Sequence, residues 1–206
     1  MTENIADKAI NDTRIVKQFT NPVKEPIDSD INLFDLLDNR AKRDPEGAMV
    51  EYKGDDGTWR PYSAQVFRDM VIDLAKGLIG LGVNKGDSVA IVSRTRWEWT
   101  ALDMAIMSIG ALTVPVYETN SASQVSWIFN DSKVTLAITE DDGQRDKIEL
   151  VRSEVPTLRN VFVIEAGGLN AIKTYGESVT DAEFWEYKEA SHGDDRATIV
   201  YTSGST

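Results

Sequence analysis

The residues with the clearest chemical potential follow a short apolar run at 199–201, and they are Thr202, Ser203, Gly204, Ser205 and Thr206. Four of these five side chains carry a hydroxyl group, and the glycine lets a ligand approach the backbone closely. Successive backbone N–H groups in such a loop form a concave site that suits a phosphate group. A solvated polar tail has the same composition, and no Gly-Lys-Ser/Thr sequence follows. These residues alone therefore leave both interpretations open.

Alternating helix and strand patterns precede this loop and would have to position it. Apolar residues at helical spacing predict a helix over residues 63–81, and residues 97–109 are apolar on nearly all sides, which predicts a buried helix. Short β-branched runs between the helices predict strands at 89–92, 112–117, 134–138, 161–164 and 198–201. Such repetition requires parallel pairing through right-handed crossovers. We therefore predict a doubly wound, mainly parallel α/β sheet with flanking helices and with ligands at the carboxyl ends of its strands.

Smaller patterns complete the prediction. Residues 1–30 are polar and are expected to form an extended arm, and Asn32 can cap a helix that ends before Pro45. A small β-hairpin is expected at 48–62, around the turn sequence GDDG. Three further helices are predicted from a capping box at Ser121, from apolar residues between 148 and 155, and at 182–189, whereas residues 167–176 are expected to be irregular.

Composition limits the classes of function. The formal charge of −12 argues against a nucleic-acid partner and against polybasic docking on anionic lipid, although it leaves other peripheral membrane contact open. The absence of cysteine excludes disulfides and a protein thiol nucleophile, so any thiol chemistry must use the sulfur of a substrate. No apolar run reaches membrane-spanning length, and residues 1–20 lack the core of a signal peptide. We therefore expect a cytoplasmic protein.

Other residues that could do chemistry have simpler explanations. The glycines at 80 and 82 lack the third glycine of a dinucleotide fingerprint and end a helix. His192, the only histidine, lies next to Gly193 in an expected loop and is interpreted as a solvated linker residue, because no nucleophilic Ser or Cys is assigned to it as a catalytic partner. Paired aspartates along the chain are turn signals, so no metal ligand is assigned. Arg94 and Arg96 could meet an anion, but a structural ion pair with a local carboxylate is favoured.

Context gives the hydroxyl-rich loop a more specific meaning. Residues 194–206 (DDRATIVYTSGST) closely resemble the phosphate-loop signature of the AMP-forming adenylating enzymes, which continues as Thr/Ser-Gly-x-Pro-Lys-Gly. Arg196 and Ser205 depart from that signature, where an apolar residue and threonine are common. Upstream, residues 86–91 (GDSVAI) resemble the strand entry of the same family. The sequences SRTRWEW at 93–99 and VPVYET at 114–119 are most similar to the long-chain fatty acyl-CoA synthetase branch.

The resemblance implies a fold unit and an activity. Residues 31–206 would be the incomplete amino-terminal α/β adenylation domain of an ATP-dependent long-chain fatty acid–CoA ligase. Thr202 to Thr206 would bind the phosphates of ATP, with Mg²⁺ as cofactor and coenzyme A as co-substrate. The catalytic residues, the metal ligands and the carboxy-terminal domain would lie beyond residue 206, so the chain alone is expected to be inactive and to self-associate. Two alternatives remain: an enzyme that adenylates an aryl or amino acid, and a non-catalytic α/β module that binds a nucleotide or a partner.

Overall fold

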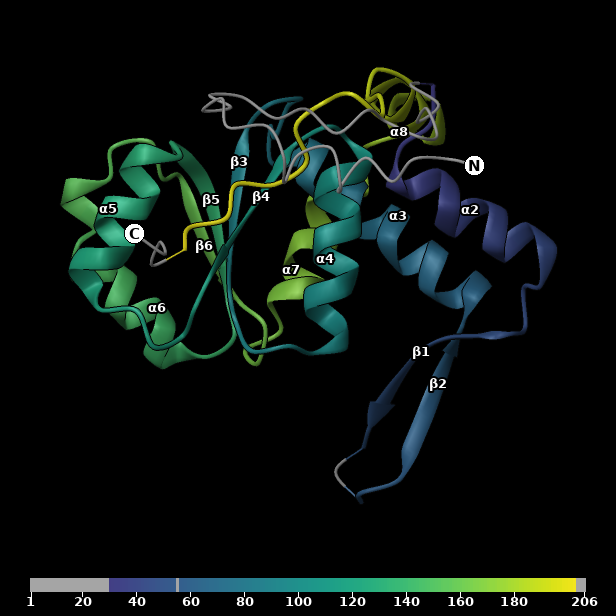
Figure 1. Cartoon of the computed structure of the whole chain (residues 1–206), viewed down its shortest axis with the longest axis horizontal. Coiled ribbons are helices and arrows are strands. Elements are labelled where there is room, and N and C mark those ends of the chain that lie inside the picture. Colours follow the sequence, from purple (N-terminus) through teal and green to yellow (C-terminus); the bar gives the residue numbers. More distant parts are fainter. Residues whose placement is uncertain (1–29, 55, 203–206) are drawn as a thin grey trace, which may run out of the picture.

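The computed structural model of the chain describes residues 30–54 and 56–202. Four of the five predicted phosphate-binding residues (Ser203, Gly204, Ser205 and Thr206) lie outside the described residues, as does the predicted arm apart from Asp30. Within the described part, a central sheet has helices on both of its sides and a hairpin projects from one end of the body (Figure 1).

The central sheet has four parallel strands, as the sequence predicts. They are β3 (Ser88–Val92), β4 (Leu112–Val116), β5 (Val134–Thr139) and β6 (Asn160–Val163), in the spatial order β4-β3-β5-β6. From β3 the chain first adds a strand on one side and then adds two on the other. The direction of winding thus reverses between β3 and β5, and ligands of open α/β sheets usually bind beyond the carboxyl ends at such a reversal.

Helices cover both faces of the sheet, so it is doubly wound. One face carries α3 (Ala64–Gly80), α4 (Trp97–Ser108) and α7 (Gly168–Tyr175), and the other carries α5 (Ala122–Asp131) and α6 (Asp142–Glu149) (Figure 1). Alternate residues of a strand point to opposite faces. In β3 these residues divide between two buried cores, with Val89 and Ile91 in the first and Ala90 and Val92 in the second.

The remaining elements surround α3. A capping box at Asn32 begins α2 (Leu33–Arg43), and Phe34 of this helix packs edge-on against Phe184 of α8 (Asp181–Glu189), with ring centroids 5.4 Å apart. Strands β1 (Ala48–Lys53) and β2 (Trp59–Ser63) form the predicted antiparallel hairpin. Tyr52 and Tyr62 stack on each other, and Tyr62 meets Trp97 of α4 at 5.0 Å, which attaches the hairpin to the body.

Three predictions about local structure are wrong. The stretch expected to be irregular contains α7, which packs against α3. The helix expected between 148 and 155 begins earlier, because Asp141 caps α6, and only the short 3-10 helix η1 (Arg152–Glu154) follows it. The expected strand at 198–201 is an extended segment with one parallel bridge, between Thr198 and Thr113.

Candidate functional site

After α8 the chain runs back to the edge strand β4. Residues 191–202, called the return segment, lie along this edge and lead to the predicted phosphate loop. Two backbone hydrogen bonds attach it, from Thr113 N–H to the Ala197 carbonyl and from Ile199 N–H to the Thr113 carbonyl, both 3.0 Å. The Thr198 hydroxyl also donates to the Thr113 carbonyl at 2.8 Å. The segment therefore runs parallel to β4, and it carries Thr202 toward the carboxyl end of that strand.

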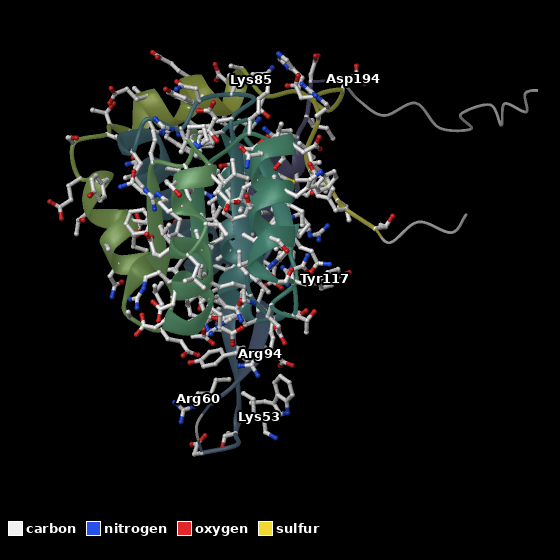
Figure 2. All side chains as sticks on the ribbon, turned by 90° about the vertical axis from the view of Figure 1, so that its left-hand side faces the viewer. Lys53, Arg60, Lys85, Arg94, Tyr117 and Asp194 are labelled. Carbon is white, nitrogen blue, oxygen red and sulfur yellow. The ribbon has the colours of Figure 1, made fainter. Side chains whose placement is uncertain are left out.

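A cluster of contacts holds the beginning of the return segment. Lys85, in the turn before β3, places its ammonium nitrogen 2.6 Å from Asp195 Oδ2 and 2.6 Å from the Ala190 carbonyl oxygen. The hydrogen bond from Lys85 lowers the pKa of the Asp195 carboxyl group. His192 is exposed, and its backbone N–H donates to the same carboxylate at 2.8 Å. Figure 2 shows Lys85 and Asp194 at the same end of the molecule, far from Arg94.

A second cluster holds the end of the return segment. The Tyr201 hydroxyl donates to Asp131 Oδ2 at 2.6 Å, and the Tyr201 ring meets the Trp127 ring edge-on with centroids 5.4 Å apart. Burial, together with the hydrogen bond to Asp131, raises the pKa of the Tyr201 hydroxyl. Thr202 follows directly and is exposed. It is the only predicted phosphate-binding residue within the described residues, which do not include 203–206.

Two hollows meet at the end of the return segment. One has a volume of ≈ 390 Å³ and includes Trp99 and Val200, and the other has a volume of ≈ 560 Å³ and includes Trp127 and Thr202. Tyr117, which follows β4 and is 73% exposed, lines both of them, as does Tyr201. The start of the loop therefore lies beside open space that a ligand can enter, at the carboxyl end of a parallel strand.

An ion-pair network occupies the reversal point between β3 and β5. Glu140, which directly follows β5 and is 3% exposed, accepts hydrogen bonds from the backbone N–H and the Nε of Arg94, both 2.9 Å. Arg96 pairs with Glu98 through two 2.8 Å hydrogen bonds and also lies 3.6 Å from Glu140. The hydrogen bond from Arg94 lowers the pKa of Glu140, despite the opposing effect of burial. The predicted structural ion pairs are confirmed, with a local carboxylate for Arg96, whereas the partner of Arg94 is 46 positions away in the sequence.

A groove of ≈ 830 Å³ lies between this network and the hairpin. Figure 2 shows Arg94 at the end of the body nearest to Lys53 and Arg60 of the hairpin. The groove is electrically balanced, because its lining contains four basic and four acidic side chains: Lys53, Arg60, Arg94, Arg96, Glu51, Glu98, Glu140 and Glu165. This balance gives no preference for an anion, so the groove is a weaker candidate for a phosphate site than the surroundings of Thr202.

Residues 30–54 and 56–202 contain no group of three or more His, Cys, Asp or Glu side chains that could hold a metal ion. No helix in these ranges is both long and apolar enough to cross a membrane.

The sequence does not reveal the side chains that hold the loop in place. Asp131, Trp127, Lys85 and Glu140 have no motif of their own, and each meets its partner across a long stretch of chain. One signal was available for Glu140. Like Arg94, it stands two positions beyond the end of a predicted strand, and parallel strands bring their carboxyl ends to one edge.

The chain is similar in sequence to known proteins. The family model "AMP-binding enzyme" matches residues 37–206. The long-chain-fatty-acid–CoA ligase FadD15 of Mycobacterium bovis is 39% identical over 168 residues, which cover 80% of this chain and 28% of the ligase. An uncharacterized protein of Mycobacterium tuberculosis is 35% identical over 135 residues, which cover 65% of this chain and 72% of that protein.

A solved structure shows the same fold. The long-chain-fatty-acid–CoA ligase FadD1 from Archaeoglobus fulgidus superposes with a TM-score of 0.71 at 20% identity, over 92% of this chain and 38% of that protein. At this low identity the likeness concerns the fold alone. The chain spans 28% of the length of the FadD15 ligases that it matches. Since the family model covers most of the sequence, the chain belongs to the AMP-binding enzyme family.

Proposed function

We propose that the protein is an ATP-dependent long-chain fatty acid–CoA ligase, in which residues 31–206 supply the α/β unit that carries the phosphate loop. The observation that carries the proposal is the position of Thr202, beyond the carboxyl end of β4 and at the rim of the hollow of ≈ 560 Å³. The similarity to FadD15 supports a fatty acid as the acyl substrate. We assign the enzyme to the cytoplasm, where ATP and coenzyme A are available, and it meets its fatty acid free or at a membrane surface.

The reaction has two steps. The carboxylate oxygen of the fatty acid attacks the α-phosphorus of ATP, the bond to the β-phosphate oxygen breaks, and pyrophosphate leaves. The thiol of coenzyme A then attacks the acyl carbon of the adenylate, so that AMP leaves and a thioester remains. The first step develops negative charge on the departing pyrophosphate, and preorganised donors that meet this charge lower the barrier.

The loop residues have a specific role in this scheme. Hydroxyl and backbone N–H groups of Thr202, Ser203, Gly204, Ser205 and Thr206 would donate to the β- and γ-phosphates. Mg²⁺ is assigned to the phosphate oxygens of ATP, and no ligand is assigned among the described residues, which contain no suitable cluster. Orientation of the carboxylate and the ATP requires further groups. We therefore expect residues 1–206 alone to bind the nucleotide weakly and to be inactive.

Pyrophosphate exchange into ATP tests the first step directly. With the complete gene product that contains this chain, exchange should depend on added fatty acid. Thr202→Ala should lower kcat/KM about tenfold through loss of one donor to a charged group. Gly204→Val should lower it further, because a side chain would block the approach of the phosphate. The control is Thr58→Ala in the turn of the hairpin, which should leave the rate unchanged.

The same assay separates the alternatives. Exchange that depends on an aryl or amino acid and not on a fatty acid would assign the protein to another branch of the family. ATP binding by the complete gene product without exchange for any acid would indicate a non-catalytic module.

A further inference from the structure

Tyr201 is the last attachment of the return segment before the predicted phosphate loop. Backbone pairing with β4 ends at Ile199, and no backbone hydrogen bond attaches residues 200–202 in the described part of the chain. The side chains of Ile199 and Tyr201 are half-buried against the core on the side of α5, whereas Val200 and Thr202 are exposed. Beyond Ile199, the course of the chain therefore depends on the Tyr201 side chain.

Two residues of α5 fix that side chain in position and direction. The hydrogen bond to Asp131 Oδ2, 2.6 Å long, sets where the Tyr201 hydroxyl lies. The ring of Trp127 meets the Tyr201 ring at an interplanar angle of 80°, and such an edge-to-face contact restricts rotation of both rings. A polar contact at the tip and an aromatic contact along the ring together leave Tyr201 little freedom.

Asp131 does not stabilise the helix α5 itself. It is the last residue of the helix, where the negative end of the helix dipole disfavours a carboxylate. Asp131 forms no ion pair with any lysine or arginine that the structure describes; its polar partner there is Tyr201. A hydrogen bond to a charged acceptor is stronger than one between neutral groups. The contribution of Asp131 therefore lies in the tether to Tyr201.

We propose that Asp131 and Trp127 are positioning residues of the nucleotide site, which act through Tyr201 to fix the direction in which the chain leaves the sheet edge at Thr202. Donors that are already oriented bind phosphate without a further loss of conformational freedom. Loss of the tether should therefore weaken ATP binding while leaving the chemical step largely intact. This inference rests on the proposed ligase function.

The test is fatty-acid-dependent pyrophosphate exchange with four variants of the complete gene product. Tyr201→Phe removes only the hydroxyl, and Asp131→Ala removes its acceptor. Each should raise KM for ATP about three- to tenfold, the size of effect expected for loss of one hydrogen bond of ordinary strength, with little change in kcat. Asp131→Asn keeps an acceptor oxygen and should restore KM to within about twofold. Tyr175→Phe is the control, because Tyr175 also meets an aromatic ring edge-on but lies on α7.

Hydrogen exchange of the peptide that contains residues 197–202 provides a readout that needs no activity. It should become faster in Tyr201→Phe and in Asp131→Ala, and it should stay unchanged in Asp131→Asn and in Tyr175→Phe. Unchanged KM for ATP in Tyr201→Phe and Asp131→Ala, in an otherwise active enzyme, would overturn the inference. If the wild-type protein showed no pyrophosphate exchange, the proposed ligase function would be wrong. The comparison of amide hydrogen exchange among the variants would then decide whether the tether of Tyr201 exists.

Discussion

The Arg94 guanidinium and the Glu140 carboxylate join the carboxyl ends of β3 and β5, the two strands between which the winding of the sheet reverses. Open α/β sheets usually bind ligands at this reversal. Here an ion pair occupies the position, and the balanced charges around it favour no anion. The proposed nucleotide site lies instead beside the edge strand β4, where Tyr201 directs the chain toward Thr202.

The Arg94–Glu140 pair should make stability depend on pH. Glu140→Gln should lower the free energy of unfolding at pH 7 by about 1–2 kcal/mol, because a buried acceptor loses its charge. The folded-state pKa of Glu140 is lowered, so its stabilisation is present above the ordinary glutamate pKa, about 4.3, and is lost as pH falls through the folded value. Urea unfolding of both proteins from about pH 7 to about pH 3 should show the difference shrinking at the acid end.

The exposed Glu186 provides a matched control for this experiment. Glu186→Gln should change stability by less than about 0.5 kcal/mol at any pH in this range. A constant difference between wild type and Glu140→Gln across the whole range would contradict the assigned ion pair.

A close approach of α3 and α7 makes a second prediction. A Cβ atom at Gly80 would lie 1.9 Å from the Tyr175 carbonyl oxygen, which belongs to the backbone and cannot move aside. Alanine is preferred over glycine within a helix by about 1 kcal/mol, so Gly80→Ala would stabilise an isolated α3. In the folded protein we expect the clash to prevail and thermal unfolding to occur several degrees lower.

Gly143→Ala is the control for Gly80→Ala. Gly143 lies in the first turn of α6, where the nearest atom to an added Cβ is a side-chain oxygen of Asp141 at 3.2 Å. This substitution should be neutral or slightly stabilising. If Gly80→Ala proved equally harmless, α7 would not pack against α3 as described.

The same contact explains why α7 could not be predicted. Two adjacent glycines, Gly167 and Gly168, stand at its start and disfavour a helix, and α7 is only eight residues long, although half of these residues are apolar. The helix depends on its packing against α3, where Gly77 and Gly80 allow the backbones to meet. By contrast, the sheet strands and α4 were predicted correctly, because burial on both faces leaves a continuous apolar run.

In the candidate site, too, local features could be predicted from the sequence and long-range contacts could not. Thr202 and its loop are predicted as a phosphate site from a local motif, because the chemistry of phosphate binding requires adjacent residues. The tether of Tyr201 to Asp131 and the pairing of Lys85 with Asp195 join residues separated by 70 and 110 positions, respectively, and a single sequence carries no signal for such contacts.

The surface around the return segment should cause the 206-residue chain to self-associate. Tyr117, Trp127 and Val200 are 73%, 61% and 56% exposed, and contiguous exposed apolar side chains promote association. Sedimentation velocity at increasing concentration should show larger species, which Val200→Lys should reduce through charge repulsion. Leu36→Lys is a matched control, since Leu36 is also 56% exposed but lies on α2. An equal effect of both lysine variants would mean that association does not involve this surface.

The Lys85–Asp195 pair should control local opening of the return segment without affecting the global stability of the fold. The Asp195 carboxylate pairs with the Lys85 ammonium group and accepts a hydrogen bond from the His192 N–H. Removal of this side chain therefore breaks two contacts at the start of the return segment. Asp195→Asn keeps an acceptor for His192 and loses only the charge. Exposed ion pairs contribute little, and we therefore expect amide exchange over 197–199 to rise about twofold in Asp195→Asn and about fivefold in Asp195→Ala. The midpoint of urea unfolding should stay nearly constant.

The dependence of amide exchange on salt separates the contribution of the Asp195 charge from that of its hydrogen bond with the His192 N–H. Raising the salt concentration to about 1 M shortens the screening length to about 3 Å, so the wild-type exchange rate should approach that of Asp195→Asn. The rate of Asp195→Ala should stay above both, because the His192 contact is absent there. Asp146→Ala, in an exposed pair on α6, should leave exchange over 197–199 unchanged at either salt concentration. If Asp195→Ala exchanged no faster than wild type, the backbone bonds of Thr113 would be sufficient to hold the segment, and Lys85 would have no part in presenting the loop.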